Sequence, residues 1–158
     1  MRRTFREQLE VEMRRDSRIH LLVGDVGYGL FDSTRREFPS RVINPGAAEQ
    51  LMMGMACGFS MEGMKPVVYS ITPFLLYRPF EFIRNYVDHE KIPVKLCASG
   101  RGKDYDWLGW SHWATDDEAH LSGFKNIKKY WPENGEVFEG QFQEFMYNKK
   151  PCYLNLSR

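Results

Sequence analysis

Ile19-His-Leu-Leu-Val-Gly-Asp-Val-Gly-Tyr-Gly29 begins with a compact apolar run, continues into a loop with three glycines and leads into a periodic segment. A short apolar run that stops at glycine is typical of a buried strand, whereas apolar residues every three or four positions are typical of a helix. The stretch therefore predicts a strand over residues 19–23, a tight turn at the glycines and a helix over residues 28–38, which Pro39 ends.

Apolar runs and longer periodic segments alternate in the same way along the rest of the chain. The pattern predicts further strands over residues 41–43, 65–71, 94–98, 127–130 and 152–156, and helices over residues 4–15, 47–61, 73–88 and 135–147. The helix over 47–61 is expected to be buried, and Thr115-Asp-Asp-Glu118 matches the capping box that starts a helix. Strands that alternate with helices predict a three-layer α/β domain, with a mostly parallel sheet of about six strands and helices on both faces.

Composition favours one ordinary globular domain. The 158 residues fit a single domain over 1–158, and 22 Lys and Arg balance 21 Asp and Glu to a net charge of +1. This balance argues against a nucleic-acid-binding protein, which normally carries a basic excess. The longest weakly polar stretch, residues 67–77, is too short to span a membrane.

The cysteines and the N-terminal residues bear on the cellular compartment. Three cysteines, spread widely over the sequence, suit free thiols in a reducing cytoplasm better than a disulfide framework. The N-terminal residues carry charges without an apolar run behind them, so no secretory signal is predicted. We therefore expect a cytoplasmic protein without a membrane segment.

Ligands of parallel sheets bind beyond the carboxyl ends of the strands, so the loops at those ends are candidate sites. Gly24-Asp-Val-Gly-Tyr-Gly29 departs from the spacing of the dinucleotide-binding fingerprint, and is either a tight turn or a loop that contacts a ligand. Asn44-Pro-Gly-Ala-Ala-Glu-Gln50 places Glu49 near the start of an otherwise apolar helix. Glu49 is either a carboxyl group poised to exchange a proton with a bound heterocycle or a first-turn residue that complements the helix dipole.

Two further loops carry aromatic side chains. Phe74 and Tyr77 lie one helical turn apart and form either a face for a planar ring or part of the core. Trp107-Leu-Gly-Trp-Ser-His-Trp113 places His112 in a loop, where it either exchanges protons with a ligand or serves a structural role. The histidines and cysteines show no metal-ligand spacing, so no metal site is predicted within the chain.

Several fragments occur in an order that resembles a known family. They are residues 24–27, 38–50, 63–68, 72–74, 109–112 and 131–134. Together they are similar to the pyrimidine-binding domain of transketolase-like thiamine diphosphate enzymes, over residues 4–158. The segment Asn-x-Gly-x-x-Glu-Gln followed by a Ser-His loop is specific in combination, although each fragment alone is weak.

The resemblance implies a cofactor and a role for each matching residue. Glu49 would hydrogen-bond N1′ of the aminopyrimidine ring of thiamine diphosphate, and so promote the tautomer that removes the C2 proton of the thiazolium. Phe74 would stack on the pyrimidine with Tyr77 beside it. Asp25 would approach the cofactor from the neighbouring chain.

Substrate contacts are implied in the same way. His112 would lie over the reacting carbon and contact substrate oxygens, so Glu49 and His112 are the expected catalytic residues. Arg158 is similar to a family arginine that holds a sugar phosphate, a group that arginine fits well. Leu108 stands where the family has an aspartate that reads a substrate hydroxyl, and a histidine expected at residues 99–101 is absent. These departures predict a less polar or differently shaped acceptor.

The resemblance also implies a divided active site. The family holds the diphosphate through Mg²⁺ at a Gly-Asp-Gly motif followed by Asn, and Gly24-Asp25-Val26 is not that motif. We therefore expect the diphosphate-binding and C-terminal domains to be absent from this chain. An obligate partner subunit would carry the diphosphate half and ligate Mg²⁺, with two copies of each chain.

The implied reaction is transfer of a ketol or acyl carbanion unit to an aldehyde, with small-molecule substrates and neither nucleic acid nor membrane as a partner. One alternative is a subunit of a split 2-oxo acid decarboxylase or dehydrogenase. Another is a non-catalytic regulatory module with the same fold. A ketose donor would favour the first reaction and a 2-oxo acid donor the second, while the presence of Glu49 and Phe74 argues against the non-catalytic module.

Overall fold

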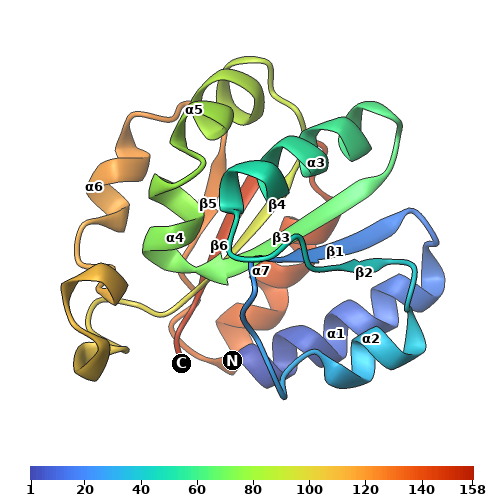
Figure 1. Ribbon diagram of the computed structural model, residues 1–158, viewed down its shortest axis with the longest axis horizontal. Coiled ribbons are helices and arrows are strands. Elements are labelled where there is room, and N and C mark those ends of the chain that lie inside the picture. Colours follow the sequence, from blue (N-terminus) through green and yellow to red (C-terminus); the bar gives the residue numbers. More distant parts are fainter.

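A six-stranded, entirely parallel sheet lies at the centre of the structure, a computed structural model that describes all residues 1–158 (Figure 1). The strand order is β2-β1-β3-β4-β6-β5. The strands are β1 (Ile19–Val23), β2 (Val42–Ile43), β3 (Lys65–Ile71), β4 (Lys95–Ser99), β5 (Lys128–Tyr130) and β6 (Cys152–Leu156). The predicted number of strands and their parallel arrangement are confirmed.

Helices cover both faces of this sheet and give the predicted three layers (Figure 1). One face carries α1 (Arg2–Arg15), α2 (Asp32–Glu37) and α7 (Gly135–Tyr147). The other carries α3 (Glu49–Met61), α4 (Thr72–Tyr77), α5 (Phe80–Phe82), the π-helix η1 (Ile83–His89) and α6 (Asp117–Ser122). Two single 3₁₀ turns, η2 (Asp106–Leu108) and η3 (Trp110–His112), lie in the loop that follows β4.

Each strand is apolar along its length because its alternate residues enter two different cores. In β3, Val67 and Tyr69 pack toward α1 and α7, whereas Val68 between them packs toward α3. In β6, Leu154 and Tyr153 divide in the same way. A parallel sheet with helices on both faces requires this continuous apolar pattern, which explains why short apolar runs located the strands.

Two predicted helices are shorter or more broken than expected. The helix predicted over residues 28–38 begins only at Asp32, because Gly27 and Gly29 take positive φ angles of 76° and 74° and form a turn first. The helix predicted over 73–88 is divided into α4, α5 and η1. Pro79 lies at the first break, where it lacks the N–H that a continuous helix would need.

Two local predictions are wrong. Helix α3 is buried on one side only, since Leu51 and Met61 on its other side are 56% and 72% exposed. The capping box does not form: α6 begins at Asp117 without a side-chain cap hydrogen bond. The N-cap residue is Asp116 rather than Thr115, so the predicted partners Thr115 and Glu118 are out of register by one residue. The Asp117 carboxylate accepts hydrogen bonds from the side chains of Tyr153 and Asn155 in β6.

The three cysteines, Cys57, Cys97 and Cys152, are free, as predicted, and all three are buried. None of the helices combines the length and apolar character that crossing a bilayer requires. The N- and C-termini lie close together in Figure 1, and Arg2 and Arg158 line the same cavity.

We predict that Phe142→Ala lowers the free energy of unfolding by about 3–5 kcal/mol, because it leaves a cavity in the core. The Phe142 side chain is fully buried, and its ring centroid lies 5.8 Å from that of Phe5 and 5.7 Å from that of Phe138. Urea unfolding measures the change. Val137→Ala, an exposed position on the same helix, is the control, and equal losses for both variants would contradict the assigned core.

Candidate functional site

The candidate residues gather at the edge of the sheet where the strands end. All strands are parallel, so the loops that leave their carboxyl ends share this edge. The Thr72 hydroxyl joins two of these loops, since it donates to the carbonyl oxygens of Ser99 at 3.1 Å and Gly100 at 2.6 Å. The loops after β1, β2, β4 and β6 begin at Gly24, Asn44, Gly100 and Ser157, and α4 follows β3 directly at Thr72.

Glu49 is the first residue of α3 and is only 1% exposed. One carboxylate oxygen, Oε1, accepts a hydrogen bond from Ser70 Oγ at 3.0 Å, and the other, Oε2, lies 2.7 Å from Nη1 of Arg78. Gly24 packs against this carboxylate so closely that a Cβ added there would lie 3.0 Å from Oε1. Each carboxylate oxygen therefore has the polar partner that burial demands.

Arg78 links the Phe74 ring to this carboxylate. The Arg78 guanidinium covers the ring, with its central carbon 3.8 Å from the ring centroid. The His112 ring meets Phe74 edge-on at 4.8 Å between centroids, and Nδ1 of His112 is 3.0 Å from Ser111 Oγ. Glu49, Phe74 and His112, which are far apart in the sequence, are thus brought into one cluster with Arg78. Arg78 was not identified from the sequence. The only feature that marks it there is a charge among aromatic residues, directly before Pro79.

Tyr77 lies on another side of α4. Its ring contacts His120 at 4.7 Å between centroids, and the structure forms no ring contact between Tyr77 and Phe74. Burial, with Asp116 nearby, raises the pKa of the Tyr77 phenol. The two aromatic residues therefore face different neighbours.

Asp25 and Asn44 connect the loops after β1 and β2. Asp25 takes a positive φ of 52°, a conformation that Asp tolerates better than most residues. The Asn44 side chain accepts from the backbone N–H of Asp25 at 3.1 Å and of Gly46 at 2.9 Å. Hydrogen bonds from Tyr28 and Asn44 hold the pKa of the Asp25 carboxyl below its ordinary value. The loop therefore presents an ionised carboxylate at the sheet edge.

The loop after β4 leaves no room for a side chain at residue 100. Gly100 has a positive φ of 94°, and a Cβ there would lie 2.5 Å from the Tyr105 ring. The Tyr105 hydroxyl is held 2.9 Å from Ser99 Oγ and accepts from Arg2 at 3.2 Å. The absence of a histidine at residues 99–101 thus goes together with a tyrosine ring that occupies the space.

Arg158 lies in a basic cavity of about 740 Å³ near the chain termini. Its guanidinium carbon is 4.2 Å from the centroid of the Trp107 ring, so the tryptophan loop holds it in place. Among the four arginines of this cavity only Arg6 forms ion pairs, with Glu7 and Glu10. Sequence reasoning missed the other members of this group because they lie at the opposite end of the chain. The lining residues are Met1, Arg2, Arg3, Arg6, Glu7, Gly27, Tyr28, Gly29, Leu30 and Arg158.

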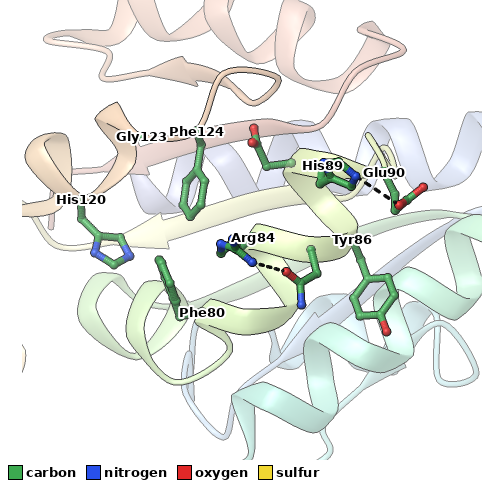
Figure 2. Close-up of a pocket in the computed structure, with 10 residues that line it drawn as sticks. Phe80, Arg84, Tyr86, His89, Glu90, His120, Gly123 and Phe124 are labelled. Carbon is green, nitrogen blue, oxygen red and sulfur yellow. Dashed lines mark hydrogen bonds and ion pairs between the residues drawn. The ribbon is translucent and has the colours of Figure 1, made fainter.

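A separate cavity of about 700 Å³ lies between η1 and α6. Figure 2 shows Phe80, His120 and Phe124 on one side of it and the polar residues of η1 on the other. None of the six residues that the sequence singled out lines this cavity. The cluster at the carboxyl edge, rather than this cavity, is therefore the candidate functional site.

A family model described as the pyrimidine binding domain of transketolase matches residues 1–158. Among curated proteins, an uncharacterized 33.6 kDa protein in the fasciation locus of Rhodococcoides fascians is 32% identical over 90% of this chain and 46% of its own length. One subunit of the apulose-4-phosphate transketolase of Actinobacillus succinogenes is 34% identical over 63% of this chain and 32% of its own length. The chain thus spans less than half the length of these two relatives.

Among solved structures, a split-gene transketolase described as an inactive beta4 tetramer superimposes with a TM-score of 0.85. The match covers 99% of this chain and 50% of that one, at 28% identity. The transketolase of Campylobacter jejuni superimposes with a TM-score of 0.83 over 98% of this chain and 25% of that one. At 18% identity, this second likeness concerns the fold alone.

We predict that His120 makes the protein less stable below about pH 6.5, the ordinary pKa of histidine. Burial among Phe80, Phe124 and Tyr77 lowers the pKa of His120, although Asp116 opposes the shift. The unfolded chain then binds the proton more readily than the folded one, so stability is full above that pH and falls as pH decreases. Urea midpoints from pH 7.5 to pH 5 should fall less steeply for His120→Phe than for the wild type.

The exposed His89 supplies the control for this measurement. His89→Phe should keep the wild-type slope. If His120→Phe also kept it, burial of the His120 ring would not be the cause of the pH dependence.

Proposed function

We propose a function for this chain from one premise: it belongs to the transketolase pyrimidine-binding domain family, whose model matches residues 1–158. The chain acts as the pyrimidine-binding subunit of a two-component, thiamine diphosphate-dependent transketolase-like enzyme. The buried Glu49 carboxylate beside the Phe74 ring is the observation that carries this proposal. Residues 1–158 form one pyrimidine-binding unit in this reading.

The cluster fits the aminopyrimidine ring of thiamine diphosphate. Such a ring needs a carboxyl group that shares a proton with its N1′ atom and an apolar face for stacking. Arg78 already makes both contacts that the ring would make, since its planar guanidinium donates to Glu49 and lies over Phe74 at the same time. A planar group with N–H donors is therefore accepted by these two side chains together.

When bound, thiamine diphosphate supplies the nucleophilic carbon and the electron sink of ketol transfer. Glu49 holds and exchanges a proton at the ring nitrogen, and Ser70 keeps its other oxygen in place. His112, against the edge of Phe74, donates to or accepts from substrate oxygens. Asp25 supplies a carboxylate at the rim of the site. Tyr77 supports α4 from its far side.

Two further parts of the proposal concern groups outside this chain. A partner subunit would hold the diphosphate through Mg²⁺, in an assembly with two copies of each chain. The name of the Actinobacillus succinogenes relative, which is one subunit of a transketolase, and the split-gene description of the structural neighbour support a two-component enzyme. The free thiols suit a cytoplasmic location.

The basic cavity supports a phosphorylated substrate. Arg158 is joined there by Arg2 and Arg3, and none of these three pairs with a carboxylate in the structure. Unpaired guanidinium groups that converge on one cavity bind phosphate well. Gly100 and Leu108 supply no polar side chain, so the site makes fewer polar contacts with the acceptor substrate than transketolases generally do.

The first test isolates the chain from its native host with whatever binds it stoichiometrically, and measures bound thiamine diphosphate and Mg²⁺. In that complex Glu49→Gln should lower turnover by at least about 100-fold, the usual contribution of a general acid–base group. The assembly should remain intact by gel filtration. Glu62→Gln, an exposed position just after the same helix, is the control. Unchanged turnover of Glu49→Gln would refute the role of this carboxylate.

A second test concerns the substrate phosphate. Arg158→Ala should raise the Michaelis constant for a phosphorylated ketose by about tenfold, the loss expected for one charged hydrogen bond. The constant for the unphosphorylated ketose should change little. Arg36→Ala, on exposed α2, controls for net charge. Equal effects on both ketoses would show that Arg158 does not bind the substrate phosphate. Turnover of a 2-oxo acid but no ketose would favour the decarboxylase-type alternative.

A further inference from the structure

We propose that Arg78 is a gate residue: its guanidinium occupies the place of the aminopyrimidine ring in the free chain and must leave before the ring reaches Glu49. This inference rests on the proposed function, because it assumes that Glu49 and Phe74 receive that ring. It adds a competing contact within the chain itself. When the cofactor binds, its aminopyrimidine ring therefore replaces the Arg78 guanidinium at Glu49 and Phe74.

The first observation is that the Glu49 side chain is completely buried. It is 0% exposed, whereas the Arg78 side chain that covers it is 44% exposed. No ligand reaches this carboxylate in the present conformation, because Arg78 lies between it and solvent. One of the groups packed against Glu49 therefore has to move.

Arg78 is the group that can move. Ser70 is fully buried in β3, and Gly24 contributes only backbone at the end of β1. Arg78 instead lies at the end of α4, next to Pro79, where the helix is interrupted. Its side chain is already nearly half in solvent, so an outward rotation breaks only the contacts with Glu49 and Phe74.

The second observation is that Arg78 makes both contacts assigned to the ring. Nη1 lies 2.7 Å from Glu49 Oε2, and the guanidinium carbon lies 3.8 Å from the centroid of Phe74. A plain ion pair would need only the first contact. The guanidinium lies over the Phe74 ring and pairs with Glu49 at the same time, as the bound ring would have to do.

The exchange also protects the free chain. A buried carboxylate without a polar partner destabilises the folded chain, so Glu49 needs a partner before the cofactor binds. Arg78 supplies the missing partner until it is replaced by the ring, whose N1′ atom shares a proton with the Glu49 carboxyl group. The consequence is a lower affinity for the cofactor than an uncovered site would have, because each binding event must break the Arg78 contacts.

The test titrates thiamine diphosphate with Mg²⁺ into the cofactor-free complex of this chain with its partner subunit, and measures the dissociation constant by calorimetry. Arg78→Ala should bind about three- to tenfold more tightly than the wild type, since the contacts to be broken are of the size of one cation–π or charged hydrogen bond. Arg78→Gln should also bind more tightly. It replaces Arg78→Ala if that variant fails to fold, because the glutamine amide still donates to Glu49. Arg84→Ala, an exposed arginine on η1, should bind as the wild type does.

A spectroscopic readout follows the gate directly. In the complex, with ¹⁵N-labelled arginine side chains in this chain only, the Arg78 signal is the one lost in Arg78→Lys. Its protons should be shielded by the Phe74 ring in the cofactor-free complex and should move to the position of exposed arginines when the ligand is added. A structural ion pair would keep its signal in place.

The outcomes separate the gate from the proposed function. Binding that is lost in Glu49→Gln, without any gain in folded Arg78→Ala and Arg78→Gln, would retain the role of Glu49 and overturn the gate. An Arg78 signal that does not move in the saturated complex would also overturn it. If neither the wild-type complex nor any variant complex bound the ligand, the assignment of the ring to Glu49 would fail and the gate with it.

Discussion

A carboxylate buried at the start of a helix is the constraint on which the carboxyl edge of this sheet depends. Glu49 cannot remain buried without polar partners, because an uncompensated charge in an apolar environment is strongly destabilising. The surrounding elements meet this requirement from three sides. Gly24 allows a close backbone approach, Ser70 donates a hydroxyl from β3, and Arg78 reaches back from α4. The ends of β1, β3 and α4 are thereby fixed around one group.

The sequence predicted those parts of the structure that local pattern determines. Apolar runs located all six strands, because a strand buried on both faces has no polar alternation to obscure it. Local pattern failed at two helix boundaries. The Thr115–Glu118 motif forms no capping box, because Asp116 rather than Thr115 is the N-cap residue of α6. Residues 73–88 were predicted as one helix because the apolar period continues through the break at Pro79.

The candidate site was predicted in part for the same reason. Glu49 was conspicuous, since a charge in an apolar helix needs an explanation. Arg78 was not, because its meaning comes from two contacts with residues 29 and 4 positions away, and the first is invisible in the linear sequence. The basic cavity is a stronger case. Arg2 and Arg158 stand at opposite ends of the chain, and only the folded sheet brings them together.

The chemistry of the covering group explains why it is an arginine. A lysine ammonium could pair with Glu49, but it is a compact, strongly hydrated charge that cannot lie flat on Phe74 while it does so. The guanidinium is planar and carries its donors in the plane, so one group can stack on the ring and donate to the carboxylate together. These are also the properties of an aminopyrimidine. A residue that satisfies Glu49 in the absence of ligand must resemble the ligand, and therefore must compete with it. Arg78 thus stabilises the free chain but lowers its affinity for the cofactor. Its side chain is 44% exposed, which allows the guanidinium to leave and the ring to take its place.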